Sequence, residues 1–407
     1  MQGKKLVIHF SAAMTAVYML SVILVFEMRS IWTSMPKYSR INDLLLLALV
    51  GTTVIYILSR KHYTRHFLTG IITTLALCAY LFLYYFYDEY KAESFPKMVL
   101  RMCVICLLCF AMREEHKQKL FELIEKIIIV IAVVSLTFWL VGSLLGIIQP
   151  SGIEYTIWSS TDGSEVPVNN YYHLYFETQY QHFFTTTIIR NSAIFTEAPM
   201  CSFMFCFAFL VELFKKKKYN VKICILLLIS IVTCISTTGY VVAILAIFLK
   251  YVISNTGKNT VSSVLKLAIA PIVLIILVLV MEYVFESKLQ TTSGSLRMDD
   301  FAAGFKAWML HPIMGNGYGN SNSYVYMMST FRIDRKGFSN SLMQILAYGG
   351  IYLFAPYAGS FCLGAYRYFK RADWNNLVFI CLFMVMFIQS MILGRFFIKL
   401  RIQRLQK

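Results

Sequence analysis

Charged residues are scarce in this chain of 407 residues, because Asp, Glu, Lys and Arg make up only 14% of it. A soluble domain has about a quarter of its residues charged, so a water-solvated surface is excluded. Hydrophobic residues make up 58%. They gather in runs close to the roughly 20 residues that span a bilayer as a helix. These runs lack the alternation of outer-membrane strands. The sequence therefore predicts an all-α polytopic membrane protein.

A concentrated basic surface is also lacking, although the formal net charge is +17. The Lys and Arg residues lie mostly in short loops between the apolar runs, where they act as orientation signals. A nucleic-acid-binding protein would gather them on one water-facing domain. We therefore expect the lipid bilayer as a partner, and no nucleic acid.

Cysteines are missing from the long loops, since all ten lie within apolar runs. A disulfide framework is therefore not expected. Cys103, Cys106 and Cys109 are spaced three apart. This spacing favours small, polarizable side chains on one helix stripe, with a metal site as the alternative. We expect neither a metal site nor a cofactor.

Eleven apolar runs are predicted to span the membrane, which would leave the basic C-terminal segment outside, against the positive-inside rule. Either a twelfth short crossing lies near 385–398 or one earlier span is miscounted, so we expect about 11–12 transmembrane helices. The basic loops, above all the four lysines at 215–218, are predicted to be cytoplasmic. The N-terminus then starts inside and 149–190 lies outside. The runs are 6–26, 41–59, 67–87, 96–112, 127–148, 193–214, 222–236, 240–254, 262–283, 341–365 and 377–394.

This topology divides the chain into five parts. They are an N-terminal transmembrane bundle (1–148), a first outer loop (149–192), central transmembrane helices (193–283), a large second outer loop (284–340) and C-terminal transmembrane helices with a basic tail (341–407). The polar residues concentrate in the two outer loops. We therefore expect any chemistry at the extracytoplasmic face.

The second outer loop is predicted to contain an amphipathic helix on the membrane surface. Phe301, Phe305, Trp308 and Met309 recur at helical spacing, which places them on one face. Asp299 or Asp300 could cap its start. The helix should end at His311, because the residue before a proline is pushed out of the helical region.

A glycine-rich segment, GNGYGN, follows at 315–320. It is not a dinucleotide fingerprint, because Asn320 replaces the last glycine and no strand precedes it. Three glycines can expose backbone N–H groups to the oxygens of a ligand. The alternative is a plain flexible turn.

Two arginines stand at the outer side of this oily chain. Arg190 precedes the predicted span at 193–214, and Arg297 opens the helix of the second outer loop. A guanidinium binds phosphate oxygens bidentately and stays charged, so the pair indicates an anion at the membrane surface. The alternative for each is snorkelling to lipid headgroups. Glu197 lies seven residues beyond Arg190, which predicts a position about two turns down the helix and inside the span, where Pro199 should kink the helix.

Three segments in this order resemble the O-antigen polymerase and ligase superfamily of polytopic bacterial membrane glycosyltransferases. They are RNSAIFTEAP (190–199), HPIMGNGYGN (311–320) and SNSLMQIL with the following GGI (339–351). The turn ISTTG (235–239) also fits, and the resemblance covers about 185–365. Two positions depart from the pattern. The family usually has glycine where Ala193 stands, and ligase members carry a histidine where Ser339 stands.

The resemblance implies a donor glycan on polyprenyl pyrophosphate, held in the outer leaflet. Arg190 and Arg297 would neutralise the pyrophosphate leaving group. Glu197 or His311 would deprotonate or orient the acceptor hydroxyl. The chain has no D-x-D pair, the usual metal bridge of nucleotide-sugar transferases, which agrees with a metal-independent transfer. The substrate-binding residues would be Gly315, Asn316, Gly317, Tyr318, Asn320, Ser339 and Asn340.

The activity implied is polymerisation of lipid-linked oligosaccharide repeat units into a surface polysaccharide, namely O-antigen, capsule or exopolysaccharide. It would take place at the outer face of the bacterial cytoplasmic membrane. The alternatives are a ligase that transfers finished glycan to an acceptor and a transporter or flippase of lipid-linked glycan. The polymerase hypothesis also implies a chain-length regulator as a partner.

Overall fold

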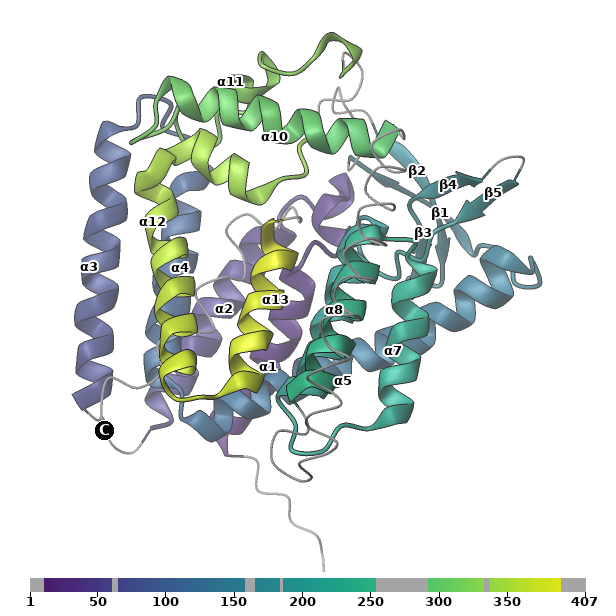
Figure 1. The fold of residues 1–407 in the computed structure, drawn as a ribbon, viewed down its shortest axis with the longest axis horizontal. Coiled ribbons are helices and arrows are strands. Elements are labelled where there is room, and N and C mark those ends of the chain that lie inside the picture. The colour runs from purple at the N-terminus through teal and green to yellow at the C-terminus, as the bar shows by residue number, and fades with distance from the viewer. Residues whose placement is uncertain are drawn as a thin grey trace, which may run out of the picture.

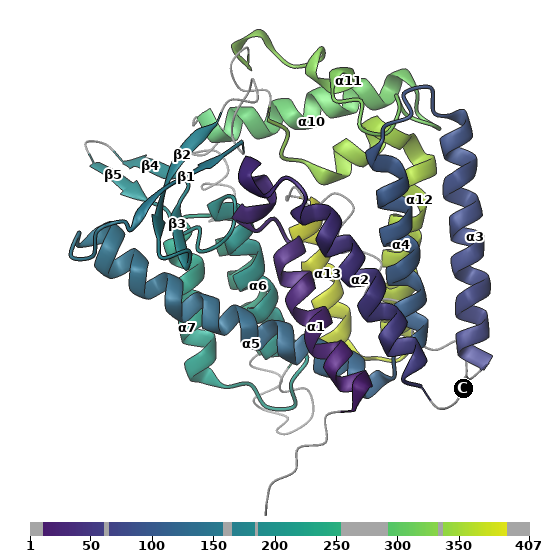
Figure 2. The same cartoon turned by 180° about the vertical axis from the view of Figure 1, so that it is seen from behind.

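The computed structural model describes residues 11–60, 65–157, 165–183, 186–253, 292–332 and 337–388. This part of the chain is mostly helical and contains twelve α-helices, as expected for an all-α polytopic membrane protein. Figures 1 and 2 show most of the helices side by side, with α10 lying across one end of the bundle. The predicted run at 262–283 and most of the crossing expected near 385–398 lie outside the described residues.

Most N-terminal helices follow the hydropathy pattern closely, but α5 (Glu114–Phe138) begins 13 residues before its predicted run at 127–148. The helices α2, α3 and α4 agree with their predicted runs to within two residues at each end. α1 packs against α2 and α5, and α3 packs against α4. The elements are α1 (Ala12–Glu27), η1 (Ile31–Ser34), η2 (Pro36–Tyr38), α2 (Ile41–Leu58), α3 (Arg65–Tyr87), α4 (Ser94–Ala111), α5 (Glu114–Phe138) and the π-helical η3 (Trp139–Leu144).

The centre of the bundle is α6 (Ala198–Phe214). It contacts α5, α7 (Val221–Thr233), α8 (Thr237–Ile253) and α13 (Trp374–Ile388). Its side chains are buried almost all round, which explains why its sequence is apolar on every face. The helix begins five residues later than the predicted run, because residues 193–197 are not helical.

Five helical stretches are long and apolar enough to cross a membrane. They are Pro36–Leu58, Arg65–Tyr87, Ser94–Ala111, Glu114–Leu144 and Ser341–Lys370. The apolar helices α1, α6, α7, α8 and α13 are shorter. Together these elements give the chain the character of a multi-pass membrane protein.

The first outer loop contains β-strands, which the sequence analysis missed. One sheet has the order β1-β2-β3 and the other pairs β4 with β5, all antiparallel. The signal was present in the β-branched and aromatic residues of the loop and in the alternation of Ile153 and Tyr155, both exposed, with Glu154 and Thr156. The strands are β1 (Gly152–Thr156), β2 (Val166–Tyr171), β3 (Tyr175–Glu177), β4 (Tyr180–Phe183) and β5 (Thr186–Ile189).

The second outer loop contains α10 (Thr292–Leu310), α11 (Asn322–Val325) and η4 (Thr330–Arg332). α10 ends at the His-Pro corner, as predicted, but it begins seven residues before Asp299. The expected aspartate cap is therefore wrong, since both aspartates lie in the helix interior. Phe301, Phe305 and Met309 are exposed, and α10 packs against α12 on its other side.

α12 (Ser341–Lys370) bends at Gly350, whose φ of 57° is not helical. The second outer loop bonds to the interrupted backbone there. The N–H groups of Ile351 and Tyr352 donate to the carbonyl oxygens of Pro312 and Ile313, both at 2.9 Å. The bend thus fixes the His-Pro corner against α12, and Pro356, six residues later, removes a further hydrogen bond of the helix.

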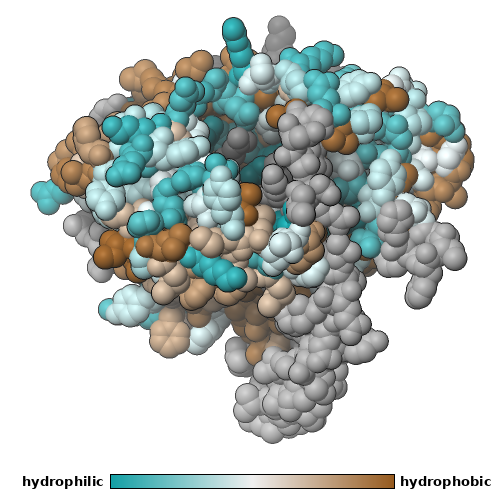
Figure 3. Space-filling model, turned by 90° about the horizontal axis from the view of Figure 1, so that it is seen from above, coloured by the Kyte–Doolittle hydropathy of each residue, from teal (hydrophilic) through white to brown (hydrophobic). Residues whose placement is uncertain are grey.

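The lysine-rich turn after α6 lies at the opposite end of the bundle from α10 (Figure 1). Lys215 donates to the side chain of Asn376, and Lys250 donates to Asn375 at 3.1 Å. The α6–α7 and α12–α13 connections therefore lie on one side. Figure 3 looks onto the end that carries α10, where hydrophilic side chains gather.

Candidate functional site

Arg190 directly follows β5 and reaches the end of α7. Its backbone N–H donates to the carbonyl oxygen of Gln179 at 3.0 Å. Its guanidinium donates from Nε to the carbonyl of Cys234 (3.0 Å) and from Nη2 to the carbonyl of Ile235 (3.1 Å). These carbonyls lie at the C-terminus of α7, where intrahelical donors are lacking. Arg190 therefore fixes the turn between α7 and α8.

Arg297 reaches the same turn from α10. Its Nη1 donates to the hydroxyl of Thr238, in the first turn of α8, at 3.2 Å. The two arginines are 107 positions apart in the sequence. The structure brings them together on the segment ISTTG (235–239), which we call the α7–α8 turn.

Glu197 occupies the N-cap position of α6, and its charge acts on both arginines. Residues 190–197 precede this helix, so Glu197 is not two turns inside a span as predicted. Pro199 stands in the first turn of α6, where a proline needs no hydrogen-bond partner and causes no kink. The expectation of a proline-induced break within this span is wrong for that reason.

Two partly buried arginines and the charge of Glu197 set the electrostatics of this region. Burial lowers the pKa of Arg190, Glu197 raises it, and the nearby positive charge of Arg297 lowers it. Burial also lowers the pKa of Arg297, and Glu197 opposes this shift. A guanidinium nevertheless stays protonated in proteins. Two half-buried cations held near each other favour an anionic ligand.

The segment between Arg190 and Glu197 is held by buried polar contacts. The Asn191 side chain donates to Thr233 (3.0 Å) and Ser135 (3.3 Å), and the Ser192 hydroxyl donates to the carbonyl of Phe176 at 2.7 Å. Ala193 has a φ of 48°, a left-handed conformation that glycine adopts without strain. This conformation explains why related chains would carry glycine at that position.

His311 is separated from the arginines. It is exposed, at the opposite end of α10 from Arg297. α10 is one continuous helix, and 14 residues at 1.5 Å each put the two about 20 Å apart. The expectation that the His311 corner meets Arg190 and Arg297 is therefore not met.

The glycine-rich segment packs against other parts of the chain. Gly315 lies against the backbone of Tyr348 and Gly349, and Gly317 lies against Asp88 and Tyr90. The Tyr318 N–H donates to the Asp88 carboxylate at 3.0 Å. These glycines have positive φ and permit close approach.

The amides of this segment are also engaged within the fold. The Asn316 side chain donates to the carbonyls of Ala307 (2.7 Å) and Ala347 (2.9 Å), which joins α10 to α12. The Asn320 side chain donates to the Asn316 carbonyl at 3.0 Å. These contacts give the segment a structural role as a link between α10 and α12. Its role in binding substrate stays a prediction.

We expect Gly350→Ala to destabilise the protein. An added Cβ would lie 2.3 Å from the carbonyl oxygen of Ile313 at a φ of 57°. Left-handed strain and overpacking together should cost about 2–5 kcal/mol, measured as a fall in the unfolding temperature in detergent. Gly359→Ala in the same helix is the matched control, because nothing lies within 4 Å of its added Cβ. Equal unfolding temperatures for the two variants would contradict this packing argument.

Ser339 and Asn340 lie at the start of α12. The Ser339 N–H and hydroxyl donate to Asp300 Oδ2 at 2.8 and 2.5 Å. The Asn340 side chain caps α12 by accepting from the Met343 N–H at 3.1 Å. Both residues therefore position the junction between α10 and α12.

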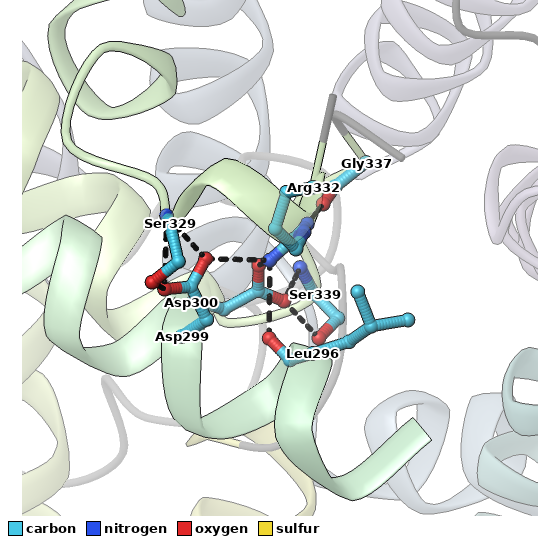
Figure 4. Close-up of polar contacts among 7 residues, drawn as sticks. All are labelled: Leu296, Asp299, Asp300, Ser329, Arg332, Gly337 and Ser339. Atoms are coloured by element: carbon cyan, nitrogen blue, oxygen red, sulfur yellow. Dashed lines mark hydrogen bonds and ion pairs between the residues drawn. The ribbon is translucent and has the colours of Figure 1, made fainter. Parts of the chain in front are cut away.

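Asp300 belongs to a buried ion-pair cluster that the sequence analysis did not foresee (Figure 4). Arg332 Nη1 lies 2.6 Å from Asp300 and 3.4 Å from Asp299, and it also donates to the Leu296 carbonyl at 3.1 Å. The Asp299 carboxylate accepts from the Ser329 hydroxyl at 2.6 Å. The cluster holds the segment after α11 onto α10. Hydrophobic periodicity in the sequence does not indicate an ion pair of this kind.

Apolar helices, an end of the bundle covered by α10 and two arginines on one turn define a polytopic membrane protein with a candidate site for an anion. Residues 222–358, about a third of the chain, match the model of the O-antigen ligase family. This match supports the resemblance to the O-antigen polymerase and ligase superfamily. It covers the α7–α8 turn, Arg297, the glycine-rich segment and Ser339. Comparison with curated proteins finds no significant match.

Proposed function

We propose that this protein polymerises lipid-linked oligosaccharide repeat units into a surface polysaccharide. The donor would be a glycan on polyprenyl pyrophosphate at the outer face of the bacterial cytoplasmic membrane. The observation that carries the proposal is the convergence of Arg190 and Arg297 on the α7–α8 turn, beside Glu197. The match of residues 222–358 to an O-antigen ligase family supports the same class of chemistry.

The transfer would use the arginines as the electrophilic part of the site. The acceptor hydroxyl oxygen forms a bond to the anomeric carbon of the donor, and the bond from that carbon to the pyrophosphate oxygen breaks. The electron pair stays on the pyrophosphate, whose negative charge grows. Arg190 and Arg297 stabilise that charge, and the absence of a D-x-D pair from the sequence supports a metal-independent reaction.

The proton of the acceptor hydroxyl passes to a base in this step. Glu197 and His311 are the two sequence candidates, and Glu197 lies with the arginines whereas His311 lies at the far end of α10. Glu197 is therefore the base that we assign in the proposal.

A ligase that transfers finished glycan to another acceptor is the second candidate, because the matching family is described as O-antigen ligase. Ser339 favours the polymerase. It stands where ligase members would carry a histidine, and its hydroxyl is bonded to Asp300 at 2.5 Å. A chain-length regulator is the partner that we expect for a polymerase.

Deleting the gene in the producing bacterium separates these functions. A polymerase predicts that single repeat units still reach the surface, seen as loss of the long-glycan ladder on a gel. Long polymer stranded on the lipid carrier would instead indicate a ligase. Repeat units trapped inside the cell would indicate a flippase and overturn the proposal.

A further inference from the structure

Arg29 is held beside the candidate site by a short backbone pairing. It lies two residues after the end of α1. Its carbonyl oxygen accepts from the Thr196 N–H at 3.0 Å, and the Ile31 N–H donates to the Ile194 carbonyl at 2.9 Å. Ser30 and Phe195 form an antiparallel bridge between these bonds. Arg29 is thereby fixed next to the residue that precedes Glu197.

The same carboxylate acts on Arg29 and on both arginines of the site. Burial lowers the pKa of Arg29, and the charge of Glu197 raises it. Glu197 also raises the pKa of Arg190 and of Arg297. The charge of one carboxylate therefore acts on three guanidiniums from separate segments of the chain, and the backbone pairing places Arg29 next to the segment that carries that carboxylate. With all four groups ionised, they carry a net formal charge of +2.

Backbone strain gathers in the segments that carry these groups. Arg29 (φ 58°), Ala193 (φ 48°) and Ile235 (φ 49°) have left-handed conformations that are costly for residues other than glycine. Arg29 pairs with the segment before Glu197, Ala193 lies between Arg190 and Glu197, and Ile235 accepts a hydrogen bond from Arg190. Such strain persists where surrounding structure enforces it, and it clusters at functional sites.

Arg101 shows what a structural arginine looks like in this fold. It lies in α4 and is buried, and its Nε donates to Glu27 at 3.1 Å. That ion pair joins α4 to the end of α1, only two residues before Arg29. Arg101 is thus held by an ion pair with Glu27. The charge of Glu197, by contrast, acts on Arg29, Arg190 and Arg297.

We propose that Arg29 is a third substrate-contacting arginine, which binds the pyrophosphate of the lipid-linked donor together with Arg190 and Arg297. The inference rests on the proposed function. A pyrophosphate that joins a lipid to a sugar carries two negative charges, which the net charge of the four groups matches. It gains a further charge when the sugar leaves. A third guanidinium would stabilise that added charge.

The test is binding of inorganic pyrophosphate to the full chain in phosphatidylcholine nanodiscs, measured by calorimetry. Arg29→Gln should weaken binding about tenfold or more, since a hydrogen bond to a charged group is lost. Arg29→Lys should recover part of the affinity. Lys97→Gln, which changes an exposed cation of α4, should bind like the wild type. Measured with lipid-linked repeat units, Arg29→Gln should lower kcat as well as raise KM.

Wild-type affinity in a folded Arg29→Gln variant would overturn the inference. If that variant does not fold, wild-type pyrophosphate affinity and kcat in Arg29→Lys overturn it instead, because a lysine cannot reproduce a bidentate contact. Arg190→Gln and Arg297→Gln separate the two levels of the proposal. If they lose binding while Arg29→Gln keeps it, only the role of Arg29 fails. If none of the three loses binding, the proposed function fails with it.

Discussion

Replacing Arg297 by glutamine is expected to slow glycan transfer by about 100- to 1000-fold, the usual effect of removing one donor that stabilises charge in a transition state. Arg297 is the cleaner of the two arginines to test. Its guanidinium donates to the Thr238 side chain at 3.2 Å, whereas Arg190 donates to two backbone carbonyls of the α7–α8 turn. A variant at Arg190 would therefore combine lost chemistry with a loosened turn.

The measurement is the initial rate of repeat-unit transfer by purified protein. Lys306→Gln is the matched control, because it removes a cation from the exposed side of the same helix. Arg297→Lys should fall between wild type and Arg297→Gln, since a lysine keeps the charge and loses the bidentate geometry. A folded Arg297→Gln variant that works at the wild-type rate would contradict the role given to this arginine.

Arg332→Ala is expected to destabilise the protein by about 3–5 kcal/mol, because breaking a buried ion pair leaves uncompensated charges inside. Arg332, Asp299 and Asp300 are 3%, 8% and 2% exposed. Without the guanidinium, the two adjacent carboxylates would repel each other. Asp300 also accepts two hydrogen bonds from Ser339, so the start of α12 should loosen as well.

Unfolding temperature in detergent measures this effect. The control is Lys97→Ala, which breaks an ion pair with Asp43 whose side chains are 53% and 51% exposed. Exposed pairs contribute about 0–1 kcal/mol, so this variant should unfold close to the wild type. If Arg332→Ala unfolds no earlier than Lys97→Ala, the cluster in Figure 4 does not hold the second outer loop.

The transmembrane part of the fold could be predicted well from the sequence. Each apolar run that falls within the described residues overlaps one α-helix, and α2, α3 and α4 begin and end within two residues of their predicted runs. Hydropathy could not show where α6 begins, because residues 193–195 are apolar and buried without being helical. The strands of the first outer loop were not predicted, because the many polar residues of that segment indicated a loop without regular structure.

The candidate site could be predicted only in part. Two arginines at the outer ends of predicted elements pointed to an anion, and the structure places both on the α7–α8 turn. Arg29, which we propose as a third arginine of the site, lies at the outer end of a predicted span, a position that runs against the positive-inside rule. Asp88 and Arg332 act through partners more than 30 positions away, and local sequence does not encode such contacts.

The most direct test of the central claim is a reconstitution with purified wild-type protein in nanodiscs. The substrates are lipid-linked repeat units, supplied with a chelator of divalent metals. The account predicts a ladder of glycans of two or more repeat units that remain on the lipid carrier, and the loss of this ladder in Arg297→Gln. If only single repeat units remain on the carrier after incubation with active, folded protein, the polymerase assignment is contradicted.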